Sequence, residues 1–227
     1  MKVIVIGAGA AGLMAAGQAA AAGAEVILLE KNDQPGRKIL ITGKGRCNIT
    51  NATDIQGLIK NIPGNGRFLY SAFDMFDNGD VISFFNTLGV ETKIERGERV
   101  FPVSDKAADV VEALTRYCKQ QGVKMVYSQP VETIKHREGA VTGVVSRSGE
   151  EYSADAVILA VGGASYPGTG STGDGYAIAR ELGHTVGQLK PALVPLETAE
   201  AWVKELQGLT LKNVRAAAIV SGKILAE

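Results

Sequence analysis

Residues 42–51, TGKGRCNITN, hold a dense group of side chains that could do chemistry. Lys44 and Arg46 carry positive charge beside two glycines, and Cys47 carries a thiol. This combination fits nucleophilic catalysis by the thiol, thiol redox chemistry, or the binding of a phosphate by cations and backbone N–H groups. The choice between these three depends on the partners that the rest of the chain supplies.

Partners for a reactive thiol are scarce in the sequence. The chain has two cysteines, Cys47 and Cys118, and two histidines, His136 and His184, with no metal-ligand spacing among them. A redox disulfide needs a second cysteine nearby, and a nucleophile needs a base. We therefore expect no metal site, Cys118 in the core, and Cys47 as a small apolar side chain beside a bound cofactor. A nucleophile, a redox sensor or plain core are the alternatives for Cys47.

The first thirty residues predict the element that would hold such a cofactor. A β-branched run at 3–6 leads directly into GAGAAG, then into an alanine-rich helical stretch that Gly23 ends. A second apolar run at 25–29 follows, and Glu30 closes it. Strand, glycine-rich turn, helix, strand and acid stand in the register of a dinucleotide-binding fingerprint. A tight βαβ turn without a ligand, or a secretory signal peptide, is the alternative; a signal peptide would not need Glu30 at this spacing.

Each position of the fingerprint has a physical role. Gly7 allows the tight turn, Gly9 lets a pyrophosphate approach the backbone, and Gly12 lets the helix pack closely on the strand. Glu30 would accept a hydrogen bond from a ribose hydroxyl, which favours FAD or NAD over NADP. The candidate cofactor-binding residues here are Gly7, Gly9, Ala10, Ala11, Gly12, Glu30 and Lys31.

A long polar loop is expected after Glu30, where an NAD dehydrogenase would usually continue with a further βα unit. Loops of this length inside a compact domain are usually functional. Its glycines and cations could surround a pyrophosphate, and a solvated basic loop is the alternative. The candidates are Arg37, Lys38, Gly43, Lys44, Arg46 and Asn48, with Cys47 among them.

These residues resemble a known family. GAGAAG with Glu30, followed by GRKILITGKGRCNITN, is similar to the BaiN-like and aminoacetone-oxidase-like flavoproteins of the glutathione-reductase-type FAD superfamily. RVFP at 99–102 and GSTGDGYAIARELGH at 170–184 resemble the same family, whereas Thr42 and Lys44 replace its usual serine and glycine. The resemblance implies that the loop runs along the FAD pyrophosphate toward the flavin, with Cys47 as a neighbour. It covers this whole chain but about the first half of a family member.

The middle of the chain predicts helices and then short strands. Helices are expected at 68–76 and 81–88, with Asn78 as a cap, and Ser104 is expected to cap a helix that runs to residue 121. From residue 123 the pattern changes to short β runs separated by glycine turns, which predicts a β-meander. The resemblance implies that Val131 in this meander makes a backbone contact to adenine; plain sheet filler is the alternative.

The run AVILAV at 156–161 predicts a buried strand. The resemblance implies that this strand returns to the FAD through the turn at Gly162 and Gly163. A second GxGxxG, formed by Gly168, Gly170 and Gly173, follows too far from the strand end to be a good second fingerprint. Ser171 and Asp174 are expected to cap the next helix, and His184 to follow its end.

Composition narrows the class of protein. The chain has 227 residues with zero formal net charge, so no basic field favours nucleic acid. No other segment is long and apolar enough for a membrane span, and two cysteines that are far apart in the sequence, without a disulfide framework, favour a reducing cytoplasm. PALVP at 191–195 predicts a boundary between an FAD-binding domain at 1–190 and the beginning of an incomplete second domain at 191–227. The resemblance implies that the first domain lacks its C-terminal returning segment.

The sequence therefore predicts an α/β fold: a Rossmann-like FAD-binding domain with a parallel sheet and an inserted β-meander, plus the start of a second β-rich domain. The expected function is the FAD-binding part of a flavin-dependent oxidoreductase that transfers hydride through the flavin. NADH or NADPH is the candidate donor, and the resemblance allows a small enone or amine substrate. An NAD-dependent dehydrogenase and a non-catalytic flavin-binding module are the alternatives. No catalytic residue can be named, and nothing indicates an oligomeric state.

Overall fold

The computed structural model describes residues 1–190, 197–209, 211 and 214–226. The chain divides into two compact units, Met1–Val186 and Gly187–Glu227. The first unit holds every element discussed below as part of the site. The prediction that residue 190 ends an FAD-binding domain and that a second domain opens there remains a prediction.

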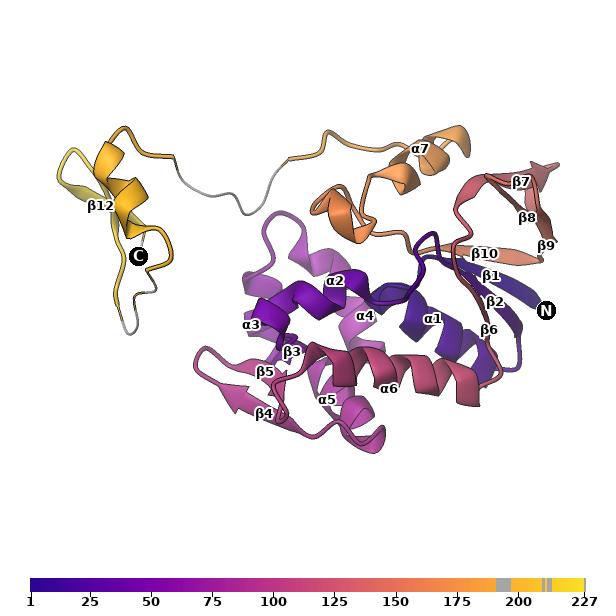
Figure 1. Ribbon diagram of the computed structural model, residues 1–227, viewed down its shortest axis with the longest axis horizontal. Coiled ribbons are helices and arrows are strands. Elements are labelled where there is room, and N and C mark those ends of the chain that lie inside the picture. The colour runs from indigo at the N-terminus through magenta and orange to yellow at the C-terminus, as the bar shows by residue number, and fades with distance from the viewer. Residues whose placement is uncertain (191–196, 210, 212–213, 227) are drawn as a thin grey trace. The chain divides into compact units, whose positions relative to one another are not determined.

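A four-stranded parallel sheet forms the centre of the first unit (Figure 1). Its order is β10 (Ala156–Leu159), β1 (Lys2–Ile6), β2 (Glu25–Leu29) and β6 (Lys124–Val126). Every pair is parallel, and β1 lies between β10 and β2. The strand order reverses at β1, because the chain first moves to β2 and later returns to the opposite side of β1 as β10. In open parallel sheets such a switch point is where ligands bind.

The side chains of β1 alternate between two hydrophobic cores, which explains why the strand has no polar face. Val3 and Val5 point into one core with helices α1 (Ala10–Ala21) and α6 (Ala107–Gln120). Ile4 and Ile6 point into the other core, on the opposite face of the sheet. A strand that is buried on both faces reads as a continuous apolar run, as expected for a parallel sheet.

The second core is covered by the inserted meander. Strands β7 (Val131–Arg137), β8 (Ala140–Ser146) and β9 (Glu151–Ser153) form an antiparallel sheet, and α7 (Asp174–Glu181) packs beside it. The predicted α/β class with a parallel sheet and an inserted meander is confirmed. One detail was wrong: the run at 123–128 forms β6, which extends the parallel sheet instead of joining the meander.

The segment between β2 and β6 carries the remaining elements of the first unit. The segment that was expected to be a loop contains a short helix, α2 (Arg37–Ile41), and a 3-10 turn (Thr42–Gly45). A small antiparallel sheet has the order β3-β5-β4, and short helices surround it. These elements are β3 (Thr50–Asn51), α3 (Ile55–Lys60), a 3-10 turn (Gly66–Leu69), α4 (Tyr70–Met75), α5 (Asn78–Thr87), β4 (Thr92–Glu95) and β5 (Arg99–Pro102).

The second unit is small. It contains a 3-10 helix (Ala201–Leu206) and an antiparallel pair, β11 (Ala218–Val220) with β12 (Lys223–Ala226). A helical piece followed by strands was the expected order. Among the described residues of the whole chain, no helix combines the length and apolar character needed to cross a membrane.

Two predicted helix caps were wrong by a small shift. The cap of α5 is Asp77, whose carboxylate accepts from the Asp80 N–H at 2.9 Å, while Asp80 accepts from the Asp77 N–H. Asn78 turns its amide toward the carbonyls of Asn51 and Thr53 instead. For α6, Lys106 takes the cap position without a side-chain bond.

Ser104 lies just outside α6 and accepts from the Lys106 N–H at 3.3 Å. The pair expected to cap α7 was also wrong. Gly173 is its cap residue, with φ of +86°, because a left-handed backbone leads into this helix. Ser171 and Asp174 both bond to lysines from elsewhere in the fold.

Candidate functional site

A cavity of about 720 Å³ lies where β1, β2 and β10 end. The turn after β1 makes it possible: Gly7 has φ of +101°, and its N–H donates to the Leu29 carbonyl at 2.7 Å. A Cβ on Gly7 would lie 2.6 Å from the Ala160 carbonyl oxygen, so no larger residue fits where the chain leaves β1 beside the end of β10. The volume falls within the range of small-molecule and cofactor sites, about 300–1,000 Å³.

The N-terminus of α1 opens into this cavity. Gly9 caps the helix without a side-chain hydrogen bond, and the first turn contains no acidic residue. Gly9, Ala10 and Ala11 line the cavity, and a Cβ on Gly9 would meet nothing within 4 Å. The first N–H groups of a helix have no partner inside the helix and attract anions. This end of the cavity is therefore suited to a phosphate.

Gly12 has a different role from the other fingerprint glycines. A Cβ at this position would lie 1.7 Å from the Gly7 carbonyl oxygen and 3.4 Å from the Ala160 side chain. Gly12 does not line the cavity. Its predicted part in helix–strand packing agrees with this geometry, and its place among the cofactor-binding residues stays a prediction.

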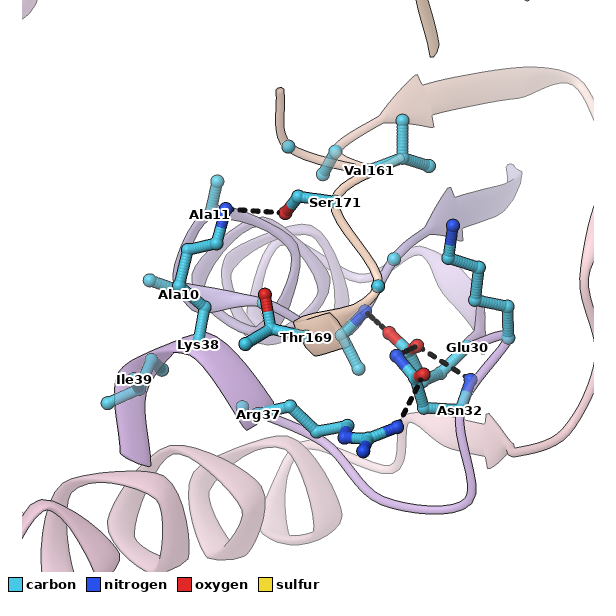
Figure 2. Close-up of a pocket in the computed structure, with 18 of the residues that line it drawn as sticks. Ala10, Ala11, Glu30, Asn32, Arg37, Lys38, Ile39, Val161, Thr169 and Ser171 are labelled. Carbon is cyan, nitrogen blue, oxygen red and sulfur yellow. Dashed lines mark hydrogen bonds between the residues drawn. The ribbon is translucent and has the colours of Figure 1, made fainter. Parts of the chain in front are cut away.

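Glu30 stands at the end of β2, buried at 7% exposure. Its carboxylate accepts from the Ala8 N–H at 2.6 Å, from the Asn32 N–H at 2.8 Å and from the Asn32 side chain at 2.6 Å (Figure 2). These bonds hold the carboxylate against the wall of the cavity, next to the glycine-rich turn. Asn32, which sequence reasoning missed, also accepts from Arg37 at 3.0 Å.

Two lysines of the segment after β2 also line the cavity. Lys38 donates to the Ser165 carbonyl at 2.9 Å and to the Ser171 hydroxyl at 2.5 Å. Lys31 donates to the Thr172 hydroxyl at 2.6 Å and pairs with Asp174 at 2.7 Å. This ion pair is the main cause that holds the pKa of Asp174 below its usual range, together with the bond from Thr172.

The opposite side of the cavity comes from the meander and from the end of β10. Val131 lines it as expected, together with Gln129 and Pro130, and the Gln129 N–H donates to the Glu30 carbonyl at 2.8 Å. Gly162 lines the cavity with φ of +76°. Gly163 does not line the cavity, and a Cβ there would lie 3.2 Å from the Tyr176 hydroxyl, so its part in cofactor binding stays a prediction.

Cys47 and Asn48 line the cavity from the segment after α2. Cys47 is 6% exposed and sits in a left-handed backbone conformation, with φ of +62°. Burial raises the pKa of its thiol, and a weaker bond with Thr42 acts in the opposite sense. A raised pKa keeps the thiol protonated near neutral pH, which disfavours the nucleophile interpretation.

A Cys47→Ser variant is expected to bind FAD within about threefold of the native affinity, because the thiol packs in the wall without a charge. Iodoacetamide at pH 8 should modify native Cys47 more slowly than a free thiol, because little thiolate is present. Mass spectrometry of the alkylated protein measures this rate, with Cys118, which is fully buried and whose pKa burial raises to about 11, as the internal reference. Rapid alkylation of Cys47 at neutral pH would restore the nucleophile interpretation.

Arg46 and Gly43 do not line the cavity, and their predicted part in cofactor binding stays a prediction. The Arg46 guanidinium pairs with Glu95 and with Asp105, at 2.7 Å from the latter, and lies 4.2 Å from the centre of the Phe101 ring. Two carboxylates and an aromatic face hold it on the antiparallel sheet. A Cβ on Gly43 would contact the Asn48 N–H and the Phe101 ring, each at 3.1 Å.

The Arg46 cluster makes a testable contribution to stability. Bonds from Arg46 hold the pKa of Glu95 below its usual range, and bonds from Lys93 and Arg46 do the same for Asp105. Carboxylates with lowered pKa values stabilise the fold above their usual pKa, and this stabilisation is lost as the pH falls through the lowered value. Arg46→Met should therefore lower the melting temperature at pH 7, and the difference from the native protein should shrink as the pH falls below the usual pKa range of carboxylates.

FAD affinity should stay within about threefold in Arg46→Met, because the guanidinium points away from the cavity. Differential scanning calorimetry at several pH values and a flavin titration check both parts. Arg99→Met is the matched control, since Arg99 lies over the same ring at 5.7 Å but donates to the Arg96 carbonyl. Loss of FAD binding in Arg46→Met alone would return Arg46 to the site.

The cavity contains residues that the sequence patterns did not mark. The polar ones lie in the segments that follow β2, β6 and β10, and most of the apolar ones come from α1, α2, α5 and α6. They include Asn32, Gln34, Gln129, Pro130, Thr169, Met14, Ile39, Ile49, Val81, Phe85, Val110 and Leu114. Proximity in sequence to Glu30 could have indicated Asn32 and Gln34, and proximity to Gly162 could have indicated Thr169, whereas no local pattern marks Gln129.

The second GxGxxG does not begin a helix at a strand end. Gly170 lines the same cavity as Gly7 and Gly9, and its loop lies between β10 and α7. It therefore contributes to one site and does not form a second fingerprint. Among the described residues, no group of histidine, cysteine and carboxylate side chains is arranged to hold a metal ion.

Comparison with known families and proteins gives one consistent result. The family described as the HI0933-like protein Rossmann domain matches residues 1–224. A 3-dehydro-bile acid delta(4,6)-reductase of Clostridium scindens is 38% identical over 229 aligned residues, which cover 100% of this chain and 54% of that protein. A ribosomal RNA dihydrouridine synthase of Escherichia coli is 32% identical over 206 residues, or 91% of this chain and 50% of that protein. The chain thus spans about half the length of these relatives.

Solved structures agree on the fold. The open conformation of a flavocytochrome c3 fumarate reductase superposes with a TM-score of 0.62 at 23% identity, over 80% of this chain and 40% of that one. A 3-ketosteroid-delta4-(5alpha)-dehydrogenase of Rhodococcus jostii RHA1 gives a TM-score of 0.52 at 20% identity, over 70% of this chain and 45% of that one. At these identities the likeness concerns the fold alone.

Proposed function

The chain belongs to the HI0933-like Rossmann domain family, and on that premise we propose that it is the FAD-binding part of a flavin-dependent oxidoreductase. The family confirms the resemblance expected from GAGAAG and GRKILITGKGRCNITN. The family match and the fold, which agrees with that of a flavocytochrome, support FAD as the cofactor and an oxidoreductase as the class of enzyme. FAD, when bound, supplies hydride transfer. The protein's own residues supply binding and orientation.

The observation that carries the proposal is the pairing of an open helix N-terminus with a buried carboxylate in one cavity. Gly9 leaves space at the start of α1 for a pyrophosphate, and Glu30 presents a fixed acceptor for a ribose hydroxyl. A negatively charged Glu30 would repel a 2′-phosphate. The residues present therefore fit a dinucleotide whose ribose is unmodified.

The wall beyond this pair favours FAD over NAD. After β2 the chain does not continue with another strand of the parallel sheet, and Lys38, Cys47 and Asn48 extend the cavity instead. A long wall from the ribose end toward Asn48 suits an extended FAD. The roles of the individual residues in binding are part of this proposal.

The activity of the whole protein is also a proposal, because this chain spans about half of its relatives. We propose reduction of a small unsaturated carbonyl compound, with NADH or NADPH as donor. The relative from Clostridium scindens, named as a reductase of a 3-dehydro bile acid, supports this class. The relative from Escherichia coli is named for ribosomal RNA, so an RNA substrate is the competing candidate. The zero net charge of this chain favours the small molecule.

A reducing cytoplasm is the proposed location. Both cysteines are free and buried, and neither needs an oxidising compartment to stabilise the fold.

A visible absorption spectrum tests the proposed function. The purified chain, mixed with FAD and passed through a desalting column, should retain the flavin bands. Anaerobic NADH or NADPH, added to a protein that includes the remainder of the relatives' length, should bleach them. A chain that retains no flavin but binds NAD in a parallel titration would support the dehydrogenase alternative. Retained flavin that no electron donor reduces would support the non-catalytic module.

A further inference from the structure

A loop after β10 lies against the cavity and is closed at its base. We call residues 163–173 the strap. The Gly173 N–H donates to the Gly163 carbonyl at 3.1 Å, so the two ends of the strap are held together. Left-handed backbone at Tyr166, with φ of +54°, and at Gly170, with φ of +97°, turns the strap back on itself. Compact loops with adjacent ends are often functional.

Lys38 ties one side of the strap to α2. Its ammonium group donates to the Ser165 carbonyl and to the Ser171 hydroxyl. Figure 2 shows the bond between Lys38 and Ser171. Ser171 is 7% exposed. Both bonds cross from the segment after β2 to the segment after β10, and neither partner carries a negative charge.

Lys31 ties the other side of the strap. It donates to Thr172 within the strap and pairs with Asp174, the first residue of α7. Next to the Ser171 and Thr172 contacts the strap approaches Asn32 closely, because a Cβ on Gly170 would lie 2.6 Å from the Asn32 amide nitrogen. Asn32 in turn donates to Glu30. The strap therefore lies directly against the residues that would hold the ribose.

We propose that Lys31 and Lys38 act as latches that hold the strap against the cavity and thereby set the rate at which the bound dinucleotide leaves. This inference rests on the proposed FAD site. Lys31, Lys38, Ser171 and Asp174 all line the cavity, so each latch spans part of its wall. Because the base of the strap is fixed by Gly163 and Gly173, release of the latches frees its middle without unfolding the sheet. The latches are positioning residues and have no role in hydride transfer.

Release kinetics of the FAD-loaded chain test the proposal. FAD release after dilution is followed by flavin fluorescence, and FAD binding is followed by its quenching. Lys38→Met and Lys31→Met should each raise the release rate roughly tenfold, the factor that corresponds to about 1.4 kcal/mol. The association rate should change less than the release rate, because the strap already opens when the cofactor enters. Lys119→Met is the matched control, because it removes the same charge from an exposed position on α6.

A substitution at Asp174 distinguishes the effect of the Lys31–Asp174 ion pair on release from a direct attraction between Lys31 and the cofactor. Asp174→Asn should raise the release rate as Lys31→Met does, and the double variant should be no faster than either single one. Simple attraction of Lys31 for a phosphate predicts instead that Asp174→Asn slows release, because it leaves the lysine unpaired. Unchanged release in both lysine variants, or a fall confined to the association rate, would overturn the latch while FAD binding still supports the proposed function. A native chain that binds no FAD would overturn both.

Discussion

A Glu30→Arg variant is expected to lose FAD binding by at least about 100-fold. The native carboxylate accepts three hydrogen bonds, from the Ala8 N–H and from the backbone and side chain of Asn32. Arginine has no acceptor, so it leaves these buried donors unpaired, at about 1–3 kcal/mol each. It also removes the acceptor proposed for the ribose and places a large cation at the cavity wall. Isothermal titration with FAD measures the loss.

Two further substitutions sharpen the Glu30 experiment. Glu30→Gln keeps one oxygen acceptor and nearly the same shape, and it should weaken FAD binding by about tenfold, as expected for the loss of a charge-assisted hydrogen bond. Glu25→Arg reverses a charge on the same strand at a side chain that is 69% exposed, so it should leave affinity unchanged. Equal FAD affinity in Glu30→Arg and the native chain would show that this cavity does not hold the ribose as proposed.

Substitutions at Gly9 and Gly12 are expected to have different effects: the change at Gly12 impairs folding, and the change at Gly9 impairs FAD binding. Gly12→Ala should unfold the first unit or lower its melting temperature by about 10 °C or more, because its Cβ would lie 1.7 Å from the Gly7 carbonyl oxygen. The atom in the way is backbone, so no side-chain rotation relieves the overlap. Gly9→Val should lower the melting temperature far less than Gly12→Ala does, because a Cβ there meets nothing within 4 Å.

The same pair separates folding from binding. Gly9→Val fills the space in front of the helix N-terminus, so FAD should bind at least about 100-fold more weakly to a protein with native circular dichroism. Thermal melts and flavin titrations of both variants complete the test. Native affinity in Gly9→Val would show that no phosphate lies at the start of α1. A fully stable Gly12→Ala would show that the helix packs less closely on the strand than the structure has it.

The predicted residues that line the cavity together owe their proximity to local geometry. Gly7, Gly9 and Glu30 lie within one strand–turn–helix–strand unit, so their spacing along the chain nearly determines their positions in space. The parallel sheet followed from the same cause, because β-branched runs without a polar face require burial on both sides. The meander was visible because glycine turns separate its strands.

The errors share a different cause, which is pairing between distant segments. Arg46 carries a positive charge that could bind a phosphate, but its guanidinium pairs with Glu95 and Asp105, and neither of these is near it in sequence. Ser171 was read as a helix cap, although Lys38 is its partner across the fold. A polar side chain with several potential partners cannot be assigned from local spacing, because tertiary contacts decide which bond forms.

The place of β10 in the sheet has a consequence for how the protein is made. The Lys2 N–H donates to the Asp155 carboxylate, which is 153 positions away in the chain, where β1 pairs with β10. Residues after β10 line one side of the cavity. Contacts between such remote positions form slowly, because the intervening chain loses conformational entropy before the strand pairing stabilises the fold. During synthesis, β1, α1 and β2 can emerge and pair well before β10 leaves the ribosome. Cofactor capture is therefore expected to be a late event of biogenesis, after the polypeptide through α7 has been released from the exit tunnel.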